Sequence, residues 1–254
     1  MGVLNIDHPD IQEFIHLKND NKTLTNFNIS VAVSTKFMQH LASDTPFPLV
    51  WGGVEVRRVS PYKLWQEISE SAWISGDPGV LFMDRINEYN TVPNLGQIEA
   101  TNPCGEQPLL SYESCNLGSV NLARSVIGSP SKPRIHYERM RSVIRTAVRF
   151  LDNVIDMNQY PLPEIEAITK GNRKIGLGVM GLADLLIRLN VPYDTDEALR
   201  IGEEIMGFVW EEARAAAVKL ARERGVFPNY KGSRLEEHGV RARNATVTTV
   251  APTG

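Results

Sequence analysis

The chain of 254 residues has only two cysteines, Cys104 and Cys115. So few cysteines exclude the disulfide scaffold of a small secreted protein and favour a reducing compartment. A formal net charge of -3 at pH 7 excludes a general attraction to nucleic acid or to a membrane surface. No apolar run reaches the roughly 18 residues of a membrane span, and the start, MGVLNIDHPD, lacks the regions of a signal peptide. We therefore expect a cytoplasmic protein that binds neither membranes nor nucleic acid.

The composition is that of a globular protein with a large core. Hydrophobic residues make up 42% and charged residues 22% of the chain, which allows one large domain or two small ones. The chain closes on APTG directly after the apolar run of residues 246–250. Since both ends are abrupt, we expect an internal part of a longer protein, incomplete at both ends.

Hydrophobic periodicity and capping residues predict long helices between short strands. Strands are predicted over residues 26–33 and 244–250. Helices are predicted after the N-cap Ser34, after Ser60-Pro61, and over residues 10–18, 137–158, 176–189 and 195–224. Helix 137–158 is amphipathic, and one of its sides carries Val143, Ala147, Phe150, Val154 and Met157. This alternation predicts an α/β fold.

Polar groups surround Cys104 within a very short stretch. Pro103 and Gly105 flank the cysteine, Asn102 lies two residues before it and Glu106 two residues after it. Proline fixes its own φ and favours extended geometry at the residue before it, while glycine permits angles that other residues avoid. The pattern predicts a tight loop that presents a carboxylate and an amide beside one sulfur.

Four interpretations of the two cysteines follow from the residues alone. Each could be a small buried hydrophobe. A structural zinc site would need four ligands, but the cysteines are eleven positions apart and the five histidines show no ligand spacing. A nucleophilic cysteine would need a nearby base, and the loop has no histidine. Alternatively, Cys104 is a reactive sulfur, Glu106 transfers a proton, Asn102 orients a substrate hydroxyl and Cys115 donates electrons.

Gly176, Gly178 and Gly181 form the pattern G-x-G-x-x-G. A dinucleotide site would need a hydrophobic strand before it and an acidic residue about twenty positions later. The preceding residues, GNRKI, are too polar and short for a central strand. We interpret the glycines as close helix packing.

The loop NPCGE followed by ESCNLGSVNL resembles the finger loop of the large catalytic subunit of ribonucleotide reductases, above all the adenosylcobalamin-dependent class II. The segments LTNFNISVAVSTKFM, SGDPGVLFMDRIN, NRKIGLGVMGLADLL, RERGVFP and RNATVTTVAPTG resemble that family in the family's order. The resemblance implies an α/β fold that is part of the ten-stranded barrel of the ribonucleotide reductase and glycyl-radical superfamily. Residues 1–254 would form a partial catalytic barrel domain, with the finger loop over about 98–113.

The resemblance also implies residue roles. Cys104 matches the thiyl-radical cysteine, Glu106 the general base at the ribose 3′ hydroxyl, Asn102 the amide that binds the ribose, and Cys115 one member of the reducing pair. Substrate binding would involve Asn102, Pro103, Cys104, Gly105, Glu106, Ala251, Pro252, Thr253 and Gly254, the last four at the start of a phosphate loop. An allosteric loop would comprise Lys18, Asn19, Asp20, Asn21, Lys22 and Thr23.

The implied reaction is the reduction of ribonucleotides, which we expect to be diphosphates, to 2′-deoxyribonucleotides. The implied cofactor is adenosylcobalamin, and no separate protein metal site is expected. Implied partners are deoxynucleotide or ATP effectors, a thioredoxin- or glutaredoxin-type reductant and a second copy in a homodimer. Because no third cysteine exists to pair with Cys115, we expect no turnover by this chain alone. A class I subunit fed by a separate metal protein, or a non-catalytic nucleotide-binding relic, are the alternatives.

Overall fold

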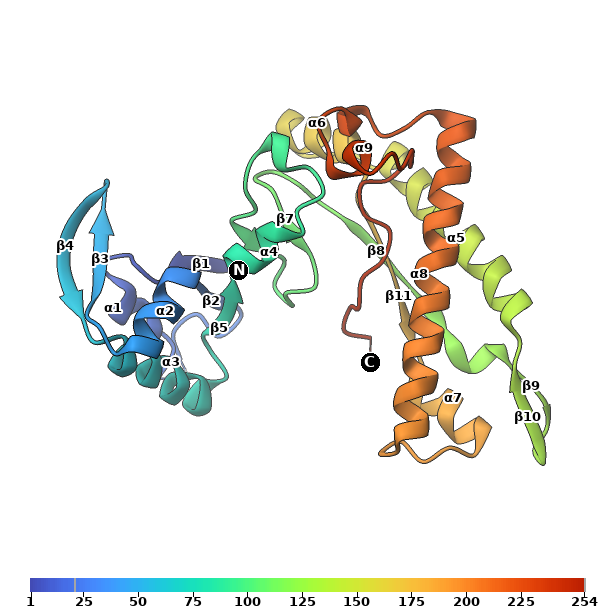
Figure 1. Cartoon of the computed structure of the whole chain (residues 1–254), viewed down its shortest axis with the longest axis horizontal. Coiled ribbons are helices and arrows are strands. Elements are labelled where there is room, and N and C mark those ends of the chain that lie inside the picture. Colours follow the sequence, from blue (N-terminus) through green and yellow to red (C-terminus); the bar gives the residue numbers. More distant parts are fainter. Residues whose placement is uncertain (21, 254) are drawn as a thin grey trace. The chain divides into compact units, whose positions relative to one another are not determined.

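The computed structural model describes residues 1–20 and 22–253 (Figure 1). The chain divides into two compact units. Unit 1 comprises Met1–Asn90 and Gln97–Leu110, and unit 2 comprises Thr91–Gly96 and Ser111–Gly254. Each unit has its own cluster of buried apolar side chains. A single partial barrel domain over residues 1–254 stays a prediction.

Unit 1 is built on a parallel sheet of three strands in the order β1-β2-β5. Its elements are β1 (Gly2–Asn5), α1 (Ile11–His16), β2 (Ile29–Val33), α2 (Thr35–Ser43), β3 (Phe47–Trp51), β4 (Val54–Val59), α3 (Pro61–Ser75), β5 (Gly79–Phe82), α4 (Met83–Glu88), β6 (Ala100–Thr101) and β7 (Pro108–Leu109). All five residues of the central strand β2 are buried, as expected for a strand covered on both faces.

The helix starts of unit 1 confirm the capping predictions. The Ser34 hydroxyl accepts a hydrogen bond from the Phe37 N–H, and the Ser60 hydroxyl accepts one from the Lys63 N–H. Pro61 occupies the first helical position of α3, where its missing N–H costs nothing. These bonds satisfy N–H groups that would otherwise have no partner at the helix ends.

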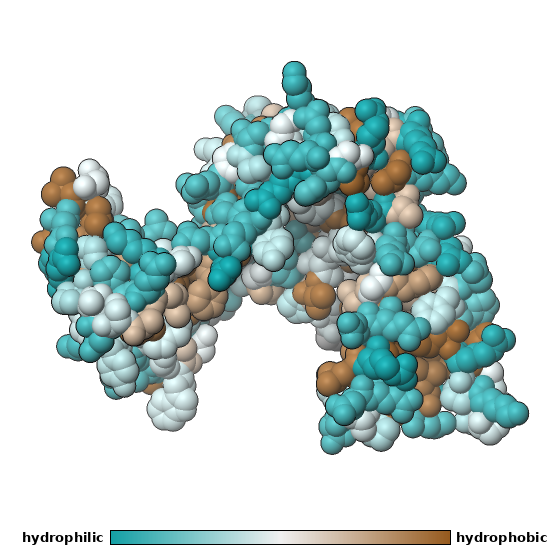
Figure 2. All heavy atoms as spheres, in the orientation of Figure 1, coloured by the Kyte–Doolittle hydropathy of each residue, from teal (hydrophilic) through white to brown (hydrophobic). Residues whose placement is uncertain are grey.

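The β3–β4 hairpin is a two-stranded antiparallel sheet with an apolar end. Trp51 and Val54 at this end are 65% and 67% exposed. Figure 2 shows hydrophobic surface over the end of this hairpin. Most of the Trp51 side chain is therefore exposed to solvent.

Unit 2 combines two long helices with a pair of parallel strands (Figure 1). Its elements are η1 (Pro93–Leu95), β8 (Asn116–Asn121), η2 (Leu122–Ser125), β9 (Val126–Ser129), β10 (Lys132–Ile135), α5 (Tyr137–Met157), α6 (Pro163–Asn172), β11 (Ile175–Met180), α7 (Leu182–Leu189), α8 (Asp196–Arg224), η3 (Pro228–Tyr230) and α9 (Arg234–Glu237). Helix α8 begins at the N-cap Thr195 and ends at Gly225, as predicted.

The core-facing side of α5 differs from the side noted in the sequence. Val143, Phe150 and Met157 are 43%, 63% and 82% exposed. The buried residues are instead Met140, Ile144, Val148, Leu151 and Ile155. Both sets repeat with helical spacing, so the pattern allowed two apolar stripes, and contact with α8, β8 and β11 buried only one of them.

The predicted helix 176–189 is wrong in its first half. Residues Ile175–Met180 form strand β11, and α7 begins only at Leu182. Gly176 and Gly178 lie inside this strand, and a Cβ on Gly178 would approach the Thr249 carbonyl oxygen to 2.8 Å. The glycines therefore allow close approach of a neighbouring backbone in a sheet, which replaces our interpretation of helix packing.

The predicted strand 244–250 is wrong as a regular strand, because residues 243–245 bend, but its second half is hydrogen-bonded to β11. The Leu177 N–H donates to the Val247 carbonyl at 2.9 Å, and the Thr249 N–H donates to the Leu177 carbonyl at 3.2 Å. A parallel bridge joins Leu177 to Thr248. The predicted α/β class is confirmed. Within residues 1–20 and 22–253 the sheets have two or three strands, and none closes into a barrel.

Candidate active site

The predicted finger loop contains a short hairpin in unit 1. Strands β6 and β7 pair antiparallel, with Ala100 opposite Leu109 and Thr101 opposite Pro108. Entry to the hairpin is held by Asn87 of α4, whose side chain accepts from the Ile98 N–H at 2.8 Å and donates to the Ile98 carbonyl at 2.9 Å. The loop of residues 102–107 therefore starts from a position fixed by a helix.

A β-turn over residues 102–105 shapes the tip of the hairpin. The Gly105 N–H donates to the Asn102 carbonyl at 3.0 Å, with Pro103 at the second position of the turn. Gly105 has φ = +85°, a left-handed conformation that glycine adopts without strain. The Asn102 side-chain oxygen accepts from the Gln107 N–H at 3.0 Å and closes the loop. Asn102 thus shapes the loop and keeps its amide N–H₂ group for a further partner.

Cys104 and Glu106 differ in their access to solvent. Cys104 is an exposed thiol at the tip, between exposed Pro103 and Gly105. Glu106 is half-buried, and its Oε2 atom is shielded from solvent. A carboxylate that lies partly out of water, two residues along the loop from an accessible sulfur, suits proton transfer at a substrate held by this loop.

The second cysteine lies in unit 2, immediately before β8. Cys115 is a half-buried thiol whose Sγ donates to the Asn116 carbonyl at 3.6 Å. Its chain neighbours bind other elements: the Ser114 hydroxyl lies 2.9 Å from that of Thr169, and the Asn116 amide donates to the Leu151 carbonyl. The Cys115 segment is therefore anchored on both sides of the sulfur.

The segment predicted to bind effectors forms a turn around one carboxylate. Asp20 accepts from the Lys22 and Thr23 N–H groups and from the Thr23 hydroxyl. These bonds, above all that from the Thr23 hydroxyl, lower the pKa of Asp20 to about 2. Lys18 pairs with Asp77 at 2.6 Å, while Asn21 lies outside the described residues. The effector role of residues 18–23 stays a prediction.

The predicted start of the phosphate loop extends from the segment beside β11. The Thr253 hydroxyl lies 3.3 Å from that of Ser119 on β8 and donates to the Ala251 carbonyl. Ala251, Pro252 and Thr253 are half-buried or exposed, and Gly254 lies outside the described residues. Phosphate contact by this segment stays a prediction.

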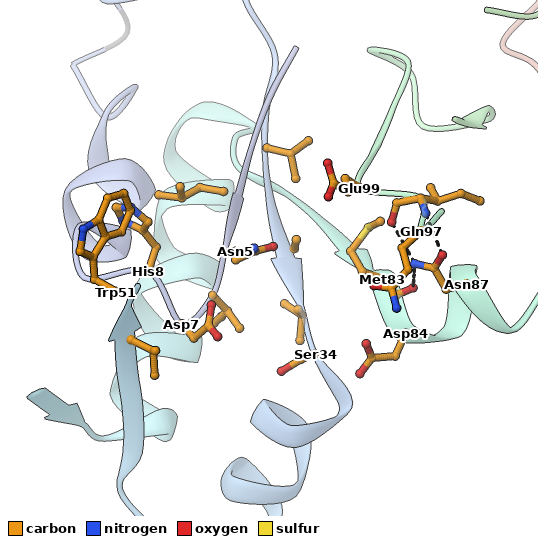
Figure 3. A pocket seen from close by; sticks show the side chains of 17 residues that line it. Asn5, Asp7, His8, Ser34, Trp51, Met83, Asp84, Asn87, Gln97 and Glu99 are labelled. Atoms are coloured by element: carbon orange, nitrogen blue, oxygen red, sulfur yellow. Dashed lines mark hydrogen bonds between the residues drawn. The ribbon is translucent and has the colours of Figure 1, made fainter. Parts of the chain in front are cut away.

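A cavity of about 600 Å³ lies in unit 1 and was missed by the sequence reasoning. Figure 3 shows its polar side chains: Asn5 ends β1, Asp7 and His8 follow it, Ser34 follows β2, and Asp84, Asn87, Gln97 and Glu99 lie opposite. Ligands of α/β sheets commonly bind outside the carboxyl ends of parallel strands. The polar run directly after a strand could have indicated this cavity.

A buried charge network in unit 2 was also missed. The Asp152 carboxylate is fully buried and accepts hydrogen bonds at 2.9 Å from Arg173 and Arg224. Arg243 lies 3.5 Å away, and Asn244 donates to the same carboxylate at 3.1 Å. Burial and the neighbouring Arg173 lower the pKa of Arg243. In the sequence, the adjacent cations Arg173 and Lys174 before an apolar run could have indicated a buried charge network.

Acid should weaken unit 2 through Asp156. Hydrogen bonds from Arg173 lower the pKa of this half-exposed carboxyl below 3.8. Since its pKa is lower in the folded state, its contribution to stability is present above the unfolded pKa and is lost as pH falls through the folded value. We expect the urea midpoint to fall below about pH 4, and to fall less in Asp156→Asn. Identical pH curves for both proteins would contradict this assignment.

Comparisons with known proteins agree with this geometry. A profile described as "Ribonucleotide reductase, barrel domain" matches residues 1–242, so the chain belongs to this family. Over its whole length the chain is 50% identical to the Vitamin B12-dependent ribonucleoside-diphosphate reductase of Thermoplasma acidophilum and 47% identical to that of Mycobacterium tuberculosis. It is 32% identical, over 89% of its length, to the ribonucleoside-diphosphate reductase large subunit of Monkeypox virus.

These relatives are much longer than the chain. It spans 33%, 36% and 33% of their respective lengths. A class Id ribonucleotide reductase alpha subunit from Actinobacillus ureae has a similar fold, with a TM-score of 0.76 and 22% sequence identity. That match covers 99% of this chain and 45% of the other. The predicted family and fold are confirmed. Within the described residues, no helix combines the length and apolar character needed to cross a membrane.

Proposed function

We propose that the polypeptide containing residues 1–254 reduces ribonucleoside diphosphates to 2′-deoxyribonucleoside diphosphates. The observation that carries this proposal is the hairpin tip, where Cys104 is accessible and a partly buried carboxylate and an amide lie two residues to either side. The names of the relatives at 47–50% identity support the same reaction class.

The balanced reaction consumes one dithiol for each nucleotide. The C2′–O bond breaks and a C2′–H bond forms, the hydroxyl leaves as water, and two thiols become a disulfide. Cys115 supplies one of these thiols, and a thiol that lies beyond the two cysteines of this chain supplies the other. The disulfide is reduced again by exchange with a thioredoxin- or glutaredoxin-type dithiol.

Three residues of the hairpin have separate roles in the reaction at the ribose. The Cys104 sulfur, as a radical, takes the hydrogen atom from C3′ and returns it after the reduction at C2′, so that the C3′–H bond is restored. The Glu106 carboxylate takes the proton of the 3′ hydroxyl, which assists departure of the 2′ hydroxyl, and such help is worth roughly 10²–10⁴-fold. The Asn102 amide, already held by its bond to Gln107, donates to the ribose and fixes its orientation.

Adenosylcobalamin supplies, when bound, the radical chemistry that removes the hydrogen atom of the Cys104 thiol. The loop geometry fits such a group, because Cys104 is exposed and a Cβ placed on Gly105 would meet no heavy atom within 4 Å beyond its chain neighbours. Cys104 is the residue that would face the cofactor. Its sulfur is accessible because it lies at the exposed tip of the hairpin.

The other parts of the proposal concern binding. Backbone N–H groups of the segment from Ala251 would contact the substrate phosphates. Effectors, deoxynucleotides or ATP, would act through residues 18–23, and the protein would work in the cytoplasm as a homodimer.

Activity with adenosylcobalamin alone tests the proposal. We expect the complete polypeptide to form deoxycytidine diphosphate from cytidine diphosphate with adenosylcobalamin and a dithiol, without any second protein subunit. The product is measured by chromatography of radiolabelled nucleotide. Turnover that requires a separate metal-bearing subunit would support a class I enzyme instead, and nucleotide binding without turnover under either condition would support a non-catalytic relic.

A further inference from the structure

The segment that carries Cys115 is tied to the rest of unit 2 by a buried ion pair. Glu113, two residues before the cysteine, accepts from the Lys174 ammonium group at 2.8 Å and from the Asn172 amide at 2.6 Å. The side chains of Glu113 and Lys174 are 0% and 3% exposed. Removing two charges from water costs desolvation free energy, so this buried pair needs a physical explanation.

Stability alone is a weak reason for this pair. Replacing a buried ion pair by apolar side chains of similar volume is often neutral or stabilising, whereas removing one partner leaves an uncompensated charge. An ion pair does, however, favour one relative position of the two segments that carry it, since the charges must lie close together. Here these are the segments that directly precede β8 and β11.

The ion pair acts where the register of these strands begins. Strands β8 and β11 pair parallel, and Asn116 lies opposite Ile175. Lys174 directly precedes this pair on one strand, and Cys115 directly precedes it on the other. A shift by one residue would turn every side chain to the opposite face of the sheet, and the Glu113–Lys174 pair lies where it can oppose such a shift.

Two further features hold Glu113 in place. Asn229 donates to the Asn172 side-chain oxygen at 2.9 Å, so that the Asn172 amide hydrogens point to Glu113. Tyr112, directly before Glu113, has φ = +62°, a left-handed conformation that is unfavourable for residues other than glycine. Such strain persists only where the surroundings impose it.

We propose that Glu113, through its ion pair with Lys174, is a positioning residue that fixes the Cys115 thiol for its oxidation to a disulfide. The inference rests on the role of Cys115 in the proposed function. In that step Cys115 and a second thiol lose two hydrogen atoms in total to the nucleotide reaction and become joined by an S–S bond. Glu113 does not touch the nucleotide and acts only through the backbone that bears the sulfur.

The first test measures the reactivity of the Cys115 thiol without turnover. In the complete polypeptide, Glu113→Gln is expected to raise the rate of Cys115 alkylation by iodoacetamide about tenfold or more, because the segment opens more often. The modified peptide is identified by mass spectrometry. The matched control is Glu166→Gln, which removes an exposed ion pair with Lys170 on α6, the helix that ends at Asn172. The control should alkylate at the wild-type rate.

The second test separates positioning from folding. Glu113→Gln leaves the Lys174 charge buried without its partner and is expected to lower the melting temperature. The double variant Glu113→Gln/Lys174→Met should regain thermal stability, because no charge stays buried, but its kcat should stay about tenfold or more below wild type with an unchanged nucleotide KM. Recovery of both stability and kcat in the double variant would overturn the proposal, since Glu113 would then be merely structural.

Cys115→Ser distinguishes failure of this inference from failure of the proposed function. If this variant turns over normally with a thioredoxin-type reductant, the redox role of Cys115 itself is wrong. If it does not, but Glu113→Gln shows wild-type alkylation and wild-type kcat, the redox role stands and the positioning role of Glu113 is wrong.

Discussion

Cys104→Ser is expected to abolish deoxynucleotide formation by the complete polypeptide and to leave its fold and nucleotide binding unchanged. A hydroxyl hydrogen is held much more strongly than a thiol hydrogen, so serine cannot take over a radical role. Cys104 is exposed at the tip of the turn, and the hydrogen bonds that close the turn involve Asn102 and Gly105. The substitution of Cys104 therefore removes no contact that shapes the loop. Radiolabelled product formation, nucleotide binding by equilibrium dialysis and thermal melting measure the three parts of this result.

A substitution in an exposed turn provides the control for Cys104→Ser. Ser131→Ala changes an exposed hydroxyl in the turn between β9 and β10, at a residue with no proposed role in binding or reaction. It should retain wild-type activity. Measurable deoxynucleotide formation by Cys104→Ser would contradict the radical assignment, because no other residue of the hairpin carries sulfur.

Asp152→Ala is expected to have the largest effect on stability. The carboxylate is fully buried and faces Arg173, Arg224 and Arg243 at 2.9–3.5 Å. Its removal leaves these cations without their shared counter-ion, and breaking a buried ion pair in this way typically costs about 3–5 kcal/mol. Since the chain has two units, hydrogen exchange of the α5 and α8 amides reports the loss in unit 2 more directly than a global unfolding curve.

Asp156→Ala is the matched control on the same helix. Asp156 also binds Arg173, but its side chain is 48% exposed, so water replaces most of what is lost. We expect this variant to speed hydrogen exchange of the α5 and α8 amides far less than Asp152→Ala does. Equal increases in exchange rate for the two substitutions would show that burial of the carboxylate does not determine its contribution to stability.

Local features of this protein could be predicted from the sequence because their causes are local. Ser34 and Ser60 cap helices through bonds to residues three positions away, and Gly225 ends α8 directly after its last turn. The turn at Asn102 to Gly105 follows from the preferences of asparagine, proline and glycine at fixed turn positions. The family resemblance was also visible, because its motifs are contiguous in the chain.

Features that depend on distant residues could not be predicted in this way. Strand β11 contains glycines that suggested a helix, and it became a strand because β8 on one side and the Thr249 segment on the other complete its hydrogen bonds. The apolar stripe of α5 that is buried was chosen by contact with α8 and the strands. Periodicity alone could not choose between two stripes that both repeat every three or four residues.

The sequence by itself determined the chemistry of the two cysteine segments: a thiol beside a carboxylate and an amide at Cys104, and a second thiol at Cys115. Only the tertiary structure decided how these thiols are held. Asn87 fixes the entry to the hairpin, and Glu113 reaches Lys174, a residue 61 positions later in the chain. The physical reason is that an ion pair needs both charges within a few ångströms, and folding rather than sequence spacing creates that distance.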